Sequence, residues 1–247
     1  MAKGIFIVGT DTDVGKSVIT AGLVYLLRKN GYRGVSYKAV QSGGIEEDGR
    51  LISADARFVN LVAGLEEDQE NINGYCLRTP VSPHLAAKLE GVKLEKAVIL
   101  KKYQALCKKY DYVIAEGSGG LVVPLIDEAY MVYDFIKELD LPLLVVARTG
   151  VGTINHTVLT VKHARQMGLE VKAIVMNGYR GSIAEEDNIK MVERLTGVPV
   201  LGVIDQLEYI DVEKGSYGNL KEEFERKMDI QVLLESMADT KDVIKDE

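Results

Sequence analysis

The sequence of 247 residues contains only two cysteines and no excess of basic residues. Cys76 and Cys107 lie far apart and form no CxxC pair, so we expect no structural zinc site. Two scattered thiols are typical of a reduced, cytoplasmic protein. The net charge is -7, with acidic and basic residues mixed along the chain, whereas a protein that binds nucleic acid needs a basic face. We therefore expect no nucleic-acid partner.

Long hydrophobic runs are also missing. No apolar stretch approaches the ~20 residues that a membrane span needs, so we expect no association with a membrane. The first apolar run, residues 5–8, is too short for the core of a signal peptide, so we expect no targeting segment. His156 and His163 share one face of a predicted helix, but no carboxylate pair accompanies them, and we do not expect them to bind a metal.

The length and composition are those of one globular domain. Apolar residues make up 47% of the chain and charged residues 27%, and 247 residues are enough for one sizeable core. We expect a single domain over residues 1–247, with a charged C-terminal extension at about residues 225–247. Apolar residues in this segment predict a helix that docks on the core, followed by a frayed tail; they are Phe224, Met228, Ile230, Leu233 and Leu234.

Short apolar runs alternate with helical patterns along most of the chain. The predicted strands cover residues 5–8, 34–40, 112–115, 143–146, 171–176 and 200–204. The predicted helices cover residues 16–29, 54–63, 84–89, 94–109, 155–167 and 184–195. Strands separated by helices pair in parallel, with crossover helices on both faces of the sheet. The pattern therefore predicts a three-layer α/β fold with a doubly wound, mostly parallel sheet.

A loop with two glycines separates the first predicted strand from the first predicted helix. Residues 9–17 read Gly-Thr-Asp-Thr-Asp-Val-Gly-Lys-Ser, in the strand–loop–helix context of a P-loop. Backbone N–H groups of such a loop and the positive end of the next helix bind phosphates. We expect Lys16 to reach the β- and γ-phosphates of a nucleotide and the Ser17 hydroxyl to bind Mg²⁺. The strict GxxxxGK[ST] spacing would place the first glycine at Thr10, so the alternative is a strand–helix turn that binds nothing.

Three further side chains stand where functional groups gather in a parallel sheet. Lys38 lies near the end of the second predicted strand; it is either functional or an edge-strand lysine that faces water. Asp55 is either a metal ligand or a carboxylate that stabilises a helix N-terminus. Glu116 closes a strand and precedes a glycine-rich segment, which suits a metal ligand beside phosphates. Ser17, Asp55 and Glu116 form a plausible set of oxygen ligands for Mg²⁺.

Five short motifs, in order along the chain, resemble those of the dethiobiotin synthetase family. They are the loop at residues 9–17, Tyr-Lys-Ala-Val-Gln-Ser-Gly at 37–43, Pro-Val-Ser-Pro-His at 80–84, Glu-Gly-Ser-Gly-Gly at 116–120, and Gly-Thr-Ile-Asn-His at 152–156. The resemblance implies a homodimeric, cytoplasmic enzyme of biotin biosynthesis that uses Mg²⁺ and ATP. Its implied reaction joins 7,8-diaminopelargonate and CO₂, through a carbamate phosphorylated by ATP, to give dethiobiotin, ADP and phosphate.

The resemblance also implies roles for individual residues. The implied catalytic residues are Lys38 and Lys16, and the implied magnesium ligands are Ser17, Asp55 and Glu116. The implied nucleotide contacts are Asp13, Val14, Gly15, Lys16, Ser17, Val18, Asp55, Glu116, Gly117, Ser118, Gly119 and Asn177. The implied substrate contacts are Thr12, Ser42, Gly152, Thr153 and Asn155, of which the last three start a helix that serves the site of the partner subunit.

Some positions depart from the family pattern. Ser17 replaces a common Thr but keeps the hydroxyl, while Ala39 and Ser118 stand where Pro and Ala are usual. Asp205 stands where the family typically has Pro, in a stretch that contacts the base. The resemblance therefore predicts neither base contacts from residues 205–212 nor a strict preference for ATP. Asn177, which matches the residue that reads adenine, is otherwise an ordinary strand-end asparagine before Gly178.

Three rival functions remain. A switch ATPase of the partitioning or cell-division type carries a signature lysine early in its P-loop, but the corresponding residue here is Asp11, which cannot neutralise a γ-phosphate. An amide-forming ligase of the cobyrinate amidase type normally carries a glutaminase domain, for which this chain is too short. A non-catalytic nucleotide-binding regulator would not need Lys16, Lys38 and the two acidic residues together.

Overall fold

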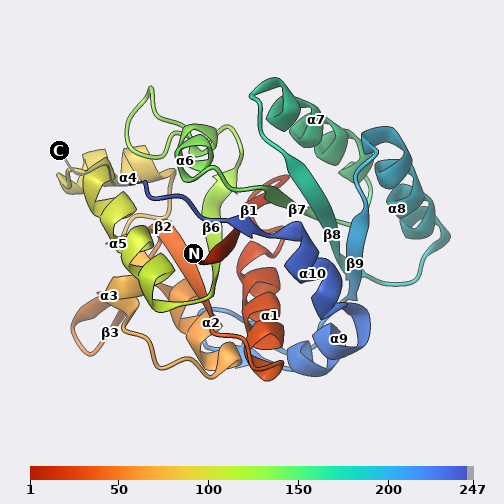
Figure 1. Ribbon diagram of the computed structural model, residues 1–247, viewed down its shortest axis with the longest axis horizontal. Coiled ribbons are helices and arrows are strands. Elements are labelled where there is room, and N and C mark those ends of the chain that lie inside the picture. The colour runs from red at the N-terminus through yellow and green to blue at the C-terminus, as the bar shows by residue number, and fades with distance from the viewer. Residues whose placement is uncertain (244–247) are drawn as a thin grey trace.

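The computed structural model describes residues 1–243, which form the strands and helices shown in Figure 1. The strands are β1 (Lys3–Gly9), β2 (Gly34–Ser42), β3 (Ile45–Glu47), β4 (Arg50–Ile52), β5 (Asn73–Leu77), β6 (Tyr112–Gly120), β7 (Leu143–Arg148), β8 (Val171–Tyr179), β9 (Val200–Asp205), β10 (Ile210–Asp211), β11 (Ser216–Tyr217) and β12 (Ala238–Asp239). The helices are α1 (Lys16–Lys29), α2 (Ala54–Ala63), α3 (Gln69–Ile72), α4 (Pro83–Glu90), α5 (Lys96–Lys109), α6 (Val132–Leu139), α7 (Thr153–Gln166), α8 (Ile183–Thr196), α9 (Leu220–Lys227) and α10 (Ile230–Ser236).

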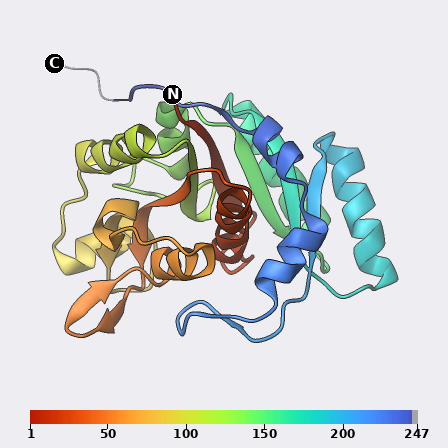
Figure 2. The ribbon, with the colours of Figure 1, turned by 60° about the horizontal axis from the view of Figure 1, so that its bottom comes forward.

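The predicted doubly wound parallel sheet is confirmed. Its strands follow the order β5-β2-β6-β1-β7-β8-β9, and each pair of neighbours in this order is parallel. Right-handed crossovers place α1 and α2 on one face and α5, α6, α7 and α8 on the other. Figure 2 shows the three resulting layers. The small hairpins β3–β4 and β10–β11 lie outside this sheet.

The apolar runs in the sequence become central strands because both faces of the sheet are covered by helices. Residues 5–8 of β1 are fully buried, and so are most residues of β2 and β7. Because β1 lies between β6 and β7, the loop that follows it emerges from the middle of the sheet. Among the helices formed by residues 1–243, none combines the length and apolar character that a bilayer span requires.

Two elements of the core were not predicted from the sequence. Strand β5 reads Asn-Gly-Tyr-Cys-Leu, which lacks alternation, and its pairing with β2 brings Gly74 against Ala39. A Cβ at Gly74 would lie 2.2 Å from the Ala39 carbonyl oxygen, so this edge strand depends on a residue of low strand preference. Helix α6 buries Phe135 and Ile136 over β6, but its eight residues are too few to give a strong periodic signal.

The segment after residue 219 contains two short helices rather than the single helix predicted from the sequence. Helix α9 ends at Lys227, and the Asp229 side chain starts α10 by accepting a hydrogen bond from the Gln231 N–H at 2.8 Å. Phe224 is fully buried against Gly22 of α1, where a Cβ would lie 2.3 Å from its ring. The break at Asp229 arises because a capping aspartate favours a new helix start over continuation.

The described end of the chain returns to the start of the sheet. Strand β12 pairs antiparallel with the beginning of β1, and Thr240 donates from its N–H and its hydroxyl to the Ala2 carbonyl at 2.8 and 3.0 Å. Residues 238–240 therefore pair with the first residues of β1, which precede its pairing with β7, instead of extending away as a charged tail. Residues 244–247, the end of the predicted frayed tail, lie outside the described residues.

A buried carboxylate outside the sheet joins α5 to the connection between α2 and α3. Glu67 accepts hydrogen bonds from Lys109 at 2.6 Å, Tyr110 at 2.5 Å and Asn71 at 2.9 Å. Burial alone would raise the pKa of Glu67, but these donors outweigh it and lower the pKa to about 2. The ionised carboxylate therefore stabilises the fold above the ordinary pKa of glutamate, and this stability is lost as the pH falls towards 2.

Replacing Glu67 by Gln is expected to lower the free energy of unfolding at pH 7 by about 1–2 kcal/mol, since charge-assisted hydrogen bonds are lost and Lys109 is partly screened by water. Urea unfolding at pH 7 and at pH 3 measures the effect. The difference between wild type and variant should shrink at the lower pH. A difference that is equal at both pH values would contradict the assigned role of the Glu67 charge.

Candidate active site

The loop after β1 has the geometry of a phosphate-binding loop. It consists of residues 10–15, and Gly15 occupies the N-cap position of α1 with φ 96°. A Cβ at Gly15 would lie 2.1 Å from the side-chain nitrogen of Asn177, and a Cβ at Gly9 would lie 2.6 Å from the Asp11 carbonyl oxygen. Both glycines are therefore required by close contacts, so the variant spacing noted in the sequence still forms a tight strand–loop–helix turn.

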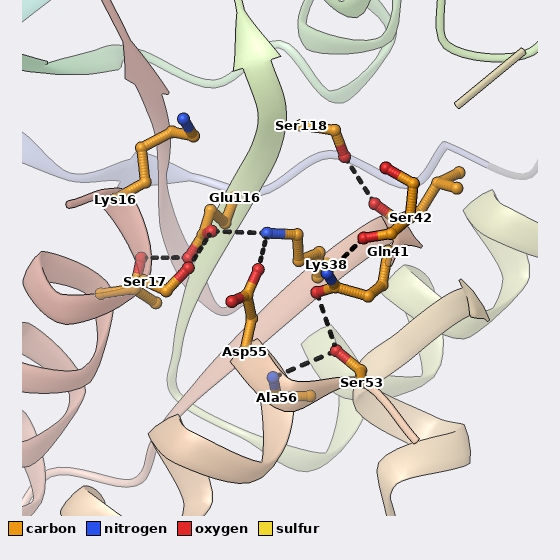
Figure 3. Close-up of polar contacts among 12 residues, drawn as sticks. Lys16, Ser17, Lys38, Gln41, Ser42, Ser53, Asp55, Ala56, Glu116 and Ser118 are labelled. Atoms are coloured by element: carbon orange, nitrogen blue, oxygen red, sulfur yellow. Dashed lines mark hydrogen bonds and ion pairs between the residues drawn. The ribbon is translucent and has the colours of Figure 1, made fainter. Parts of the chain in front are cut away.

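Lys16 is the first buried cation of the site. Its side chain folds over the loop, and Nζ donates to the Asp11 carbonyl oxygen at 3.1 Å. Burial and the nearby charge of Lys38 lower the pKa of Lys16. Figure 3 shows its ammonium pointing away from the carboxylates of Asp55 and Glu116. A buried cation whose bonded acceptor is only a carbonyl is suited to bind an anion at the loop.

Lys38 is the second buried cation, and the sheet register places it. It is the direct partner of Glu116 in the parallel pairing of β2 with β6. Its Nζ donates to Glu116 Oε1 at 2.8 Å and also forms an ion pair with Asp55 (Figure 3). Because β2 lies between β5 and β6, the alternative of an edge-strand lysine facing water is excluded.

The electrostatics of this cluster favour the charged forms of Lys38 and Asp55. Burial by itself lowers the pKa of Lys38, but the charges of Asp55 and Glu116 outweigh burial and raise it. Burial likewise raises the pKa of Asp55, and the opposing effect of Lys38 lowers it below its usual value. The trio is therefore a buried, hydrogen-bonded ion cluster in which one ammonium faces two carboxylates.

Asp55 owes its position to the start of α2. Ser53 is the N-cap residue, and its hydroxyl oxygen accepts from the Ala56 N–H at 3.2 Å. The same hydroxyl donates to the side-chain oxygen of Gln41 at 3.2 Å, which joins the helix start to the end of β2. Asp55 is thus a first-turn carboxylate of a helix, one of the two alternatives from the sequence, and it is also a partner of Lys38; its role as a metal ligand stays a prediction.

Glu116 is held by three donors. Its Oε1 accepts from Ser17 at 2.9 Å and from Lys38, while Oε2 accepts from the Thr20 hydroxyl at 2.6 Å. The sequence analysis did not single out Thr20, although its position three residues after Ser17 on a helix places both on one face. Glu116 therefore links β6 to α1 at the phosphate loop.

The oxygen atoms at this point fit Mg²⁺. Ser17, Asp55 and Glu116 offer one hydroxyl and two carboxylates, and Mg²⁺ usually combines one or two carboxylates with phosphate oxygens and water. Within residues 1–243, no group of three or more His, Cys, Asp or Glu side chains is arranged to hold a metal ion. One hydroxyl and two carboxylates suit a magnesium ion whose other ligands are phosphate oxygens and water.

The glycine-rich end of β6 lies beside the phosphate loop. Gly119 adopts φ 73°, and a Cβ there would lie 3.8 Å from the Thr12 hydroxyl at the exposed tip of the loop. The Ser118 hydroxyl donates to the Val40 carbonyl oxygen, which places it next to Ser42 at the end of β2 (Figure 3). Thr12, Ser42 and residues 117–119 therefore lie at the same end of the sheet.

A cavity of about 810 Å³ opens on the other side of the phosphate loop. Its wall includes Val14, Val18 and Asn177, whose amide donates to the Val14 carbonyl oxygen at 2.9 Å. The sequence analysis did not single out several other wall residues, because no short motif marks them and they come from separate elements and loops; they are Arg148, Thr149, Arg180, Glu185, Gln206, Leu207 and Ile210. Asp205 pairs with Arg226 and Lys227 instead of lining this cavity.

The helix start at residues 152–155 is not brought to Lys38 within one chain. Gly152, with φ 95°, caps α7, and Asn155 is exposed. Because α7 follows β7, its start is separated from the end of β2 by three strand spacings, or roughly 14 Å. Thr153 faces the cavity beside the phosphate loop, so Gly152, Thr153 and Asn155 do not share a pocket with Ser42 in the monomer.

These features define an α/β nucleotide-binding protein with an unusual pair of buried lysines. In agreement, residues 3–214 match the model of a family described as AAA domain. The sequence is 48% identical over 211 residues to ATP-dependent dethiobiotin synthetase BioD of Clostridium kluyveri, a match that covers 84% of this chain and 88% of the relative. It is 41% identical over 225 residues to the BioD protein of Clostridium perfringens, covering 90% and 98%. The chain belongs to the dethiobiotin synthetase family.

Solved structures share the fold at low sequence identity. The septum site-determining protein MinD from Pyrococcus horikoshii, complexed with Mg-ADP, superimposes with a TM-score of 0.59 at 17% identity and covers 95% of this chain and 96% of its own. A ParA family ATPase from Chlorobium tepidum gives a TM-score of 0.57 at 13% identity, covering 91% and 97%. At such identities the likeness describes the fold alone.

The two lysines are expected to differ in their contribution to stability. Replacing Lys38 by Met should lower the free energy of unfolding by about 3–5 kcal/mol, because it leaves two buried carboxylates without their cation. Replacing Lys16 by Met should change it by less than about 1 kcal/mol, because it removes a buried cation repelled by Lys38. Urea unfolding followed by circular dichroism measures both, and equal losses would contradict this description of the site.

Proposed function

We propose that this protein catalyses the ATP-dependent carboxylation and ring closure of 7,8-diaminopelargonate with CO₂ to dethiobiotin, a ligase reaction of biotin biosynthesis. Membership of the dethiobiotin synthetase family supports the reaction. The single observation in the structure that carries the proposal is the buried cluster of Lys38, Asp55 and Glu116 beside the phosphate loop. A simple nucleotide-binding module would not need this second buried lysine.

In this proposal one lysine acts on the phosphates of ATP and the other on the carbamate formed from the substrate. Lys16, which folds over the loop, neutralises the β- and γ-phosphates of ATP. Lys38 lies on β2, which β6 separates from β1, and its ammonium stabilises the carbamate and the phosphoryl group as it is transferred. Ser42 and Thr12 contact the diamine near its reacting end, and the amide of Asn177 reaches the base side of the nucleotide.

The proposed reaction has three steps. One amine of the substrate adds to CO₂ and loses a proton, which gives a carbamate. A carbamate oxygen attacks the γ-phosphorus, and ADP leaves. The second amine then attacks the carbonyl carbon, loses a proton and expels phosphate as the cyclic urea closes. Catalysis of this kind depends mainly on the positioning of the reactants and on the neutralisation of moving charge.

Ser17, Asp55 and Glu116 are the residues that would hold Mg²⁺. When bound, this ion supplies positive charge to the phosphate oxygens of ATP. The protein's own contribution is to hold two carboxylates and one hydroxyl at the junction of α1, α2 and β6. Lys38 bonds both carboxylates, so it fixes their orientation relative to each other.

A homodimer would complete the substrate site. The start of α7 has no side-chain cap and places the side chain of Asn155 at an exposed position, and a helix N-terminus is a suitable binding site for the carboxylate of the substrate. Because this helix start lies far from Lys38 within one chain, it would serve the site of the partner subunit. The unpaired cysteines Cys76 and Cys107 support a reducing compartment, and we place the reaction in the cytoplasm.

The reaction is tested by phosphate release from Mg-ATP and bicarbonate, with and without 7,8-diaminopelargonate. Wild-type protein should release phosphate only with the diamine and should form dethiobiotin, detected by mass spectrometry. Lys38→Ala should reduce the rate by a factor of about 10² or more, because a cation aimed at the developing charge is lost. Hydrolysis that does not depend on the diamine would contradict the synthetase and favour a switch ATPase.

The shared site is tested by mixing two inactive variants. Lys38→Ala removes the lysine of one half-site, and Asn155→Glu places a negative charge at the proposed carboxylate seat of the other. A heterodimer of the two keeps one intact site, so random pairing should restore activity to about a quarter of the wild-type sites. Each variant alone, taken through the same exchange of subunits, is the control. A mixture as inactive as its components would rule out sharing.

A further inference from the structure

Thr20 is a buried threonine hydroxyl whose bond reaches across the fold. It lies on α1, three residues after Ser17, and it is fully buried. Its hydroxyl donates to Glu116 Oε2 at 2.6 Å, a distance typical of a hydrogen bond from a hydroxyl to a charged carboxylate. The two residues are 96 positions apart in the sequence.

This bond is not the usual one for a threonine within a helix. Such a hydroxyl generally donates back to the carbonyl oxygen four residues earlier. Thr196 follows that rule in α8, where its hydroxyl donates to the Val192 carbonyl oxygen at 2.7 Å. Thr20 instead donates to an acidic residue at the end of β6, so its hydroxyl carries a long-range contact into the site.

The two carboxylate oxygen atoms of Glu116 have different hydrogen-bond partners. Oε1 faces Ser17 and Lys38, the residues assigned to magnesium and to the reacting groups. Oε2 accepts the hydrogen bond from Thr20, a residue that is assigned neither to magnesium nor to the reacting groups. With one oxygen anchored on α1, rotation of the carboxylate about its last bond would break the Thr20 contact, so the orientation of Oε1 is fixed.

We propose that Thr20 is a positioning residue for the magnesium site: its hydroxyl holds Oε2 of Glu116 so that Oε1 is presented to Ser17 and to the metal. The proposal rests on the function proposed above, because it assumes that Mg²⁺ accompanies the nucleotide. Removal of a residue that hydrogen-bonds to a metal ligand, and so orients it, typically lowers metal affinity by about 10–100-fold. Thr20 would affect metal binding only through its hydrogen bond to Glu116, without contacting the substrate.

The hydroxyl and the methyl group of Thr20 can be tested separately. Thr20→Val keeps the shape of the side chain but removes the donor, whereas Thr20→Ser keeps the donor and removes the methyl group. Thr196→Val is a matched control, because it also removes a buried helical hydroxyl, far from Glu116. Thermal unfolding followed by circular dichroism establishes that each variant is folded.

The measurement is the binding of Mn²⁺ in the presence of saturating ADP, followed by the loss of the free-ion electron paramagnetic resonance signal. Thr20→Val should raise the Kd for Mn²⁺ by about 10-fold or more, while Thr20→Ser should stay within about 3-fold of wild type. Thr196→Val should bind like wild type. Binding of ADP in the presence of EDTA should be the same for all four proteins, since the phosphate loop is unchanged.

Two results would overturn the inference while leaving the proposed function intact. One is a folded Thr20→Val variant that binds Mn²⁺ as wild type does. The other is a Thr20→Ser variant that loses as much affinity as Thr20→Val, which would assign the effect to packing of the methyl group. Failure of wild-type protein to bind Mn²⁺ with ADP would overturn both the magnesium site and the role of Thr20.

Discussion

The site depends on the neutralisation of one buried ammonium group by two buried carboxylates. Lys38 carries its charge into the sheet, and removing a charge from water is costly unless partners surround it. Its partners come from different elements, Glu116 from β6 and Asp55 from α2. The ion cluster therefore fixes how the ends of two strands and the start of a helix meet, and Ser17 and Thr20 extend this restraint to α1.

The same constraint explains why the two lysines are not equivalent. Lys38 is saturated by carboxylates, so its position is determined by the protein before any substrate binds. Lys16 bonds only a carbonyl oxygen of its own loop and is repelled by Lys38, which leaves its charge available to an incoming anion. Phosphoryl transfer depends mainly on positioning and on the neutralisation of charge, and the different surroundings of the two lysines are consistent with the roles proposed for them.

The predictions from the sequence succeeded where the signal is local. The alternation of apolar runs and helical patterns gave the parallel sheet, and the Gly-Lys-Ser sequence gave the phosphate loop. They failed at β5, whose glycine is tolerated only because the backbone of β2 lies against it, and at the two helices after residue 219, whose break depends on a cap at Asp229. At β5, packing against β2 outweighed the low strand propensity of glycine. After residue 219, the capping side chain of Asp229 divided the helical pattern into two helices.

By itself, the sequence determined the fold class and the phosphate loop, because strand ends and short motifs are encoded by neighbouring residues. It also predicted that Lys16, Ser17, Lys38, Asp55 and Glu116 belong to one functional set. Only the tertiary structure decided that Lys38 and Glu116 are partners in register, that Thr20 anchors the second oxygen of Glu116, and that the start of α7 lies away from Lys38. Register, burial and strand order are set by contacts between distant segments, and no local pattern records them.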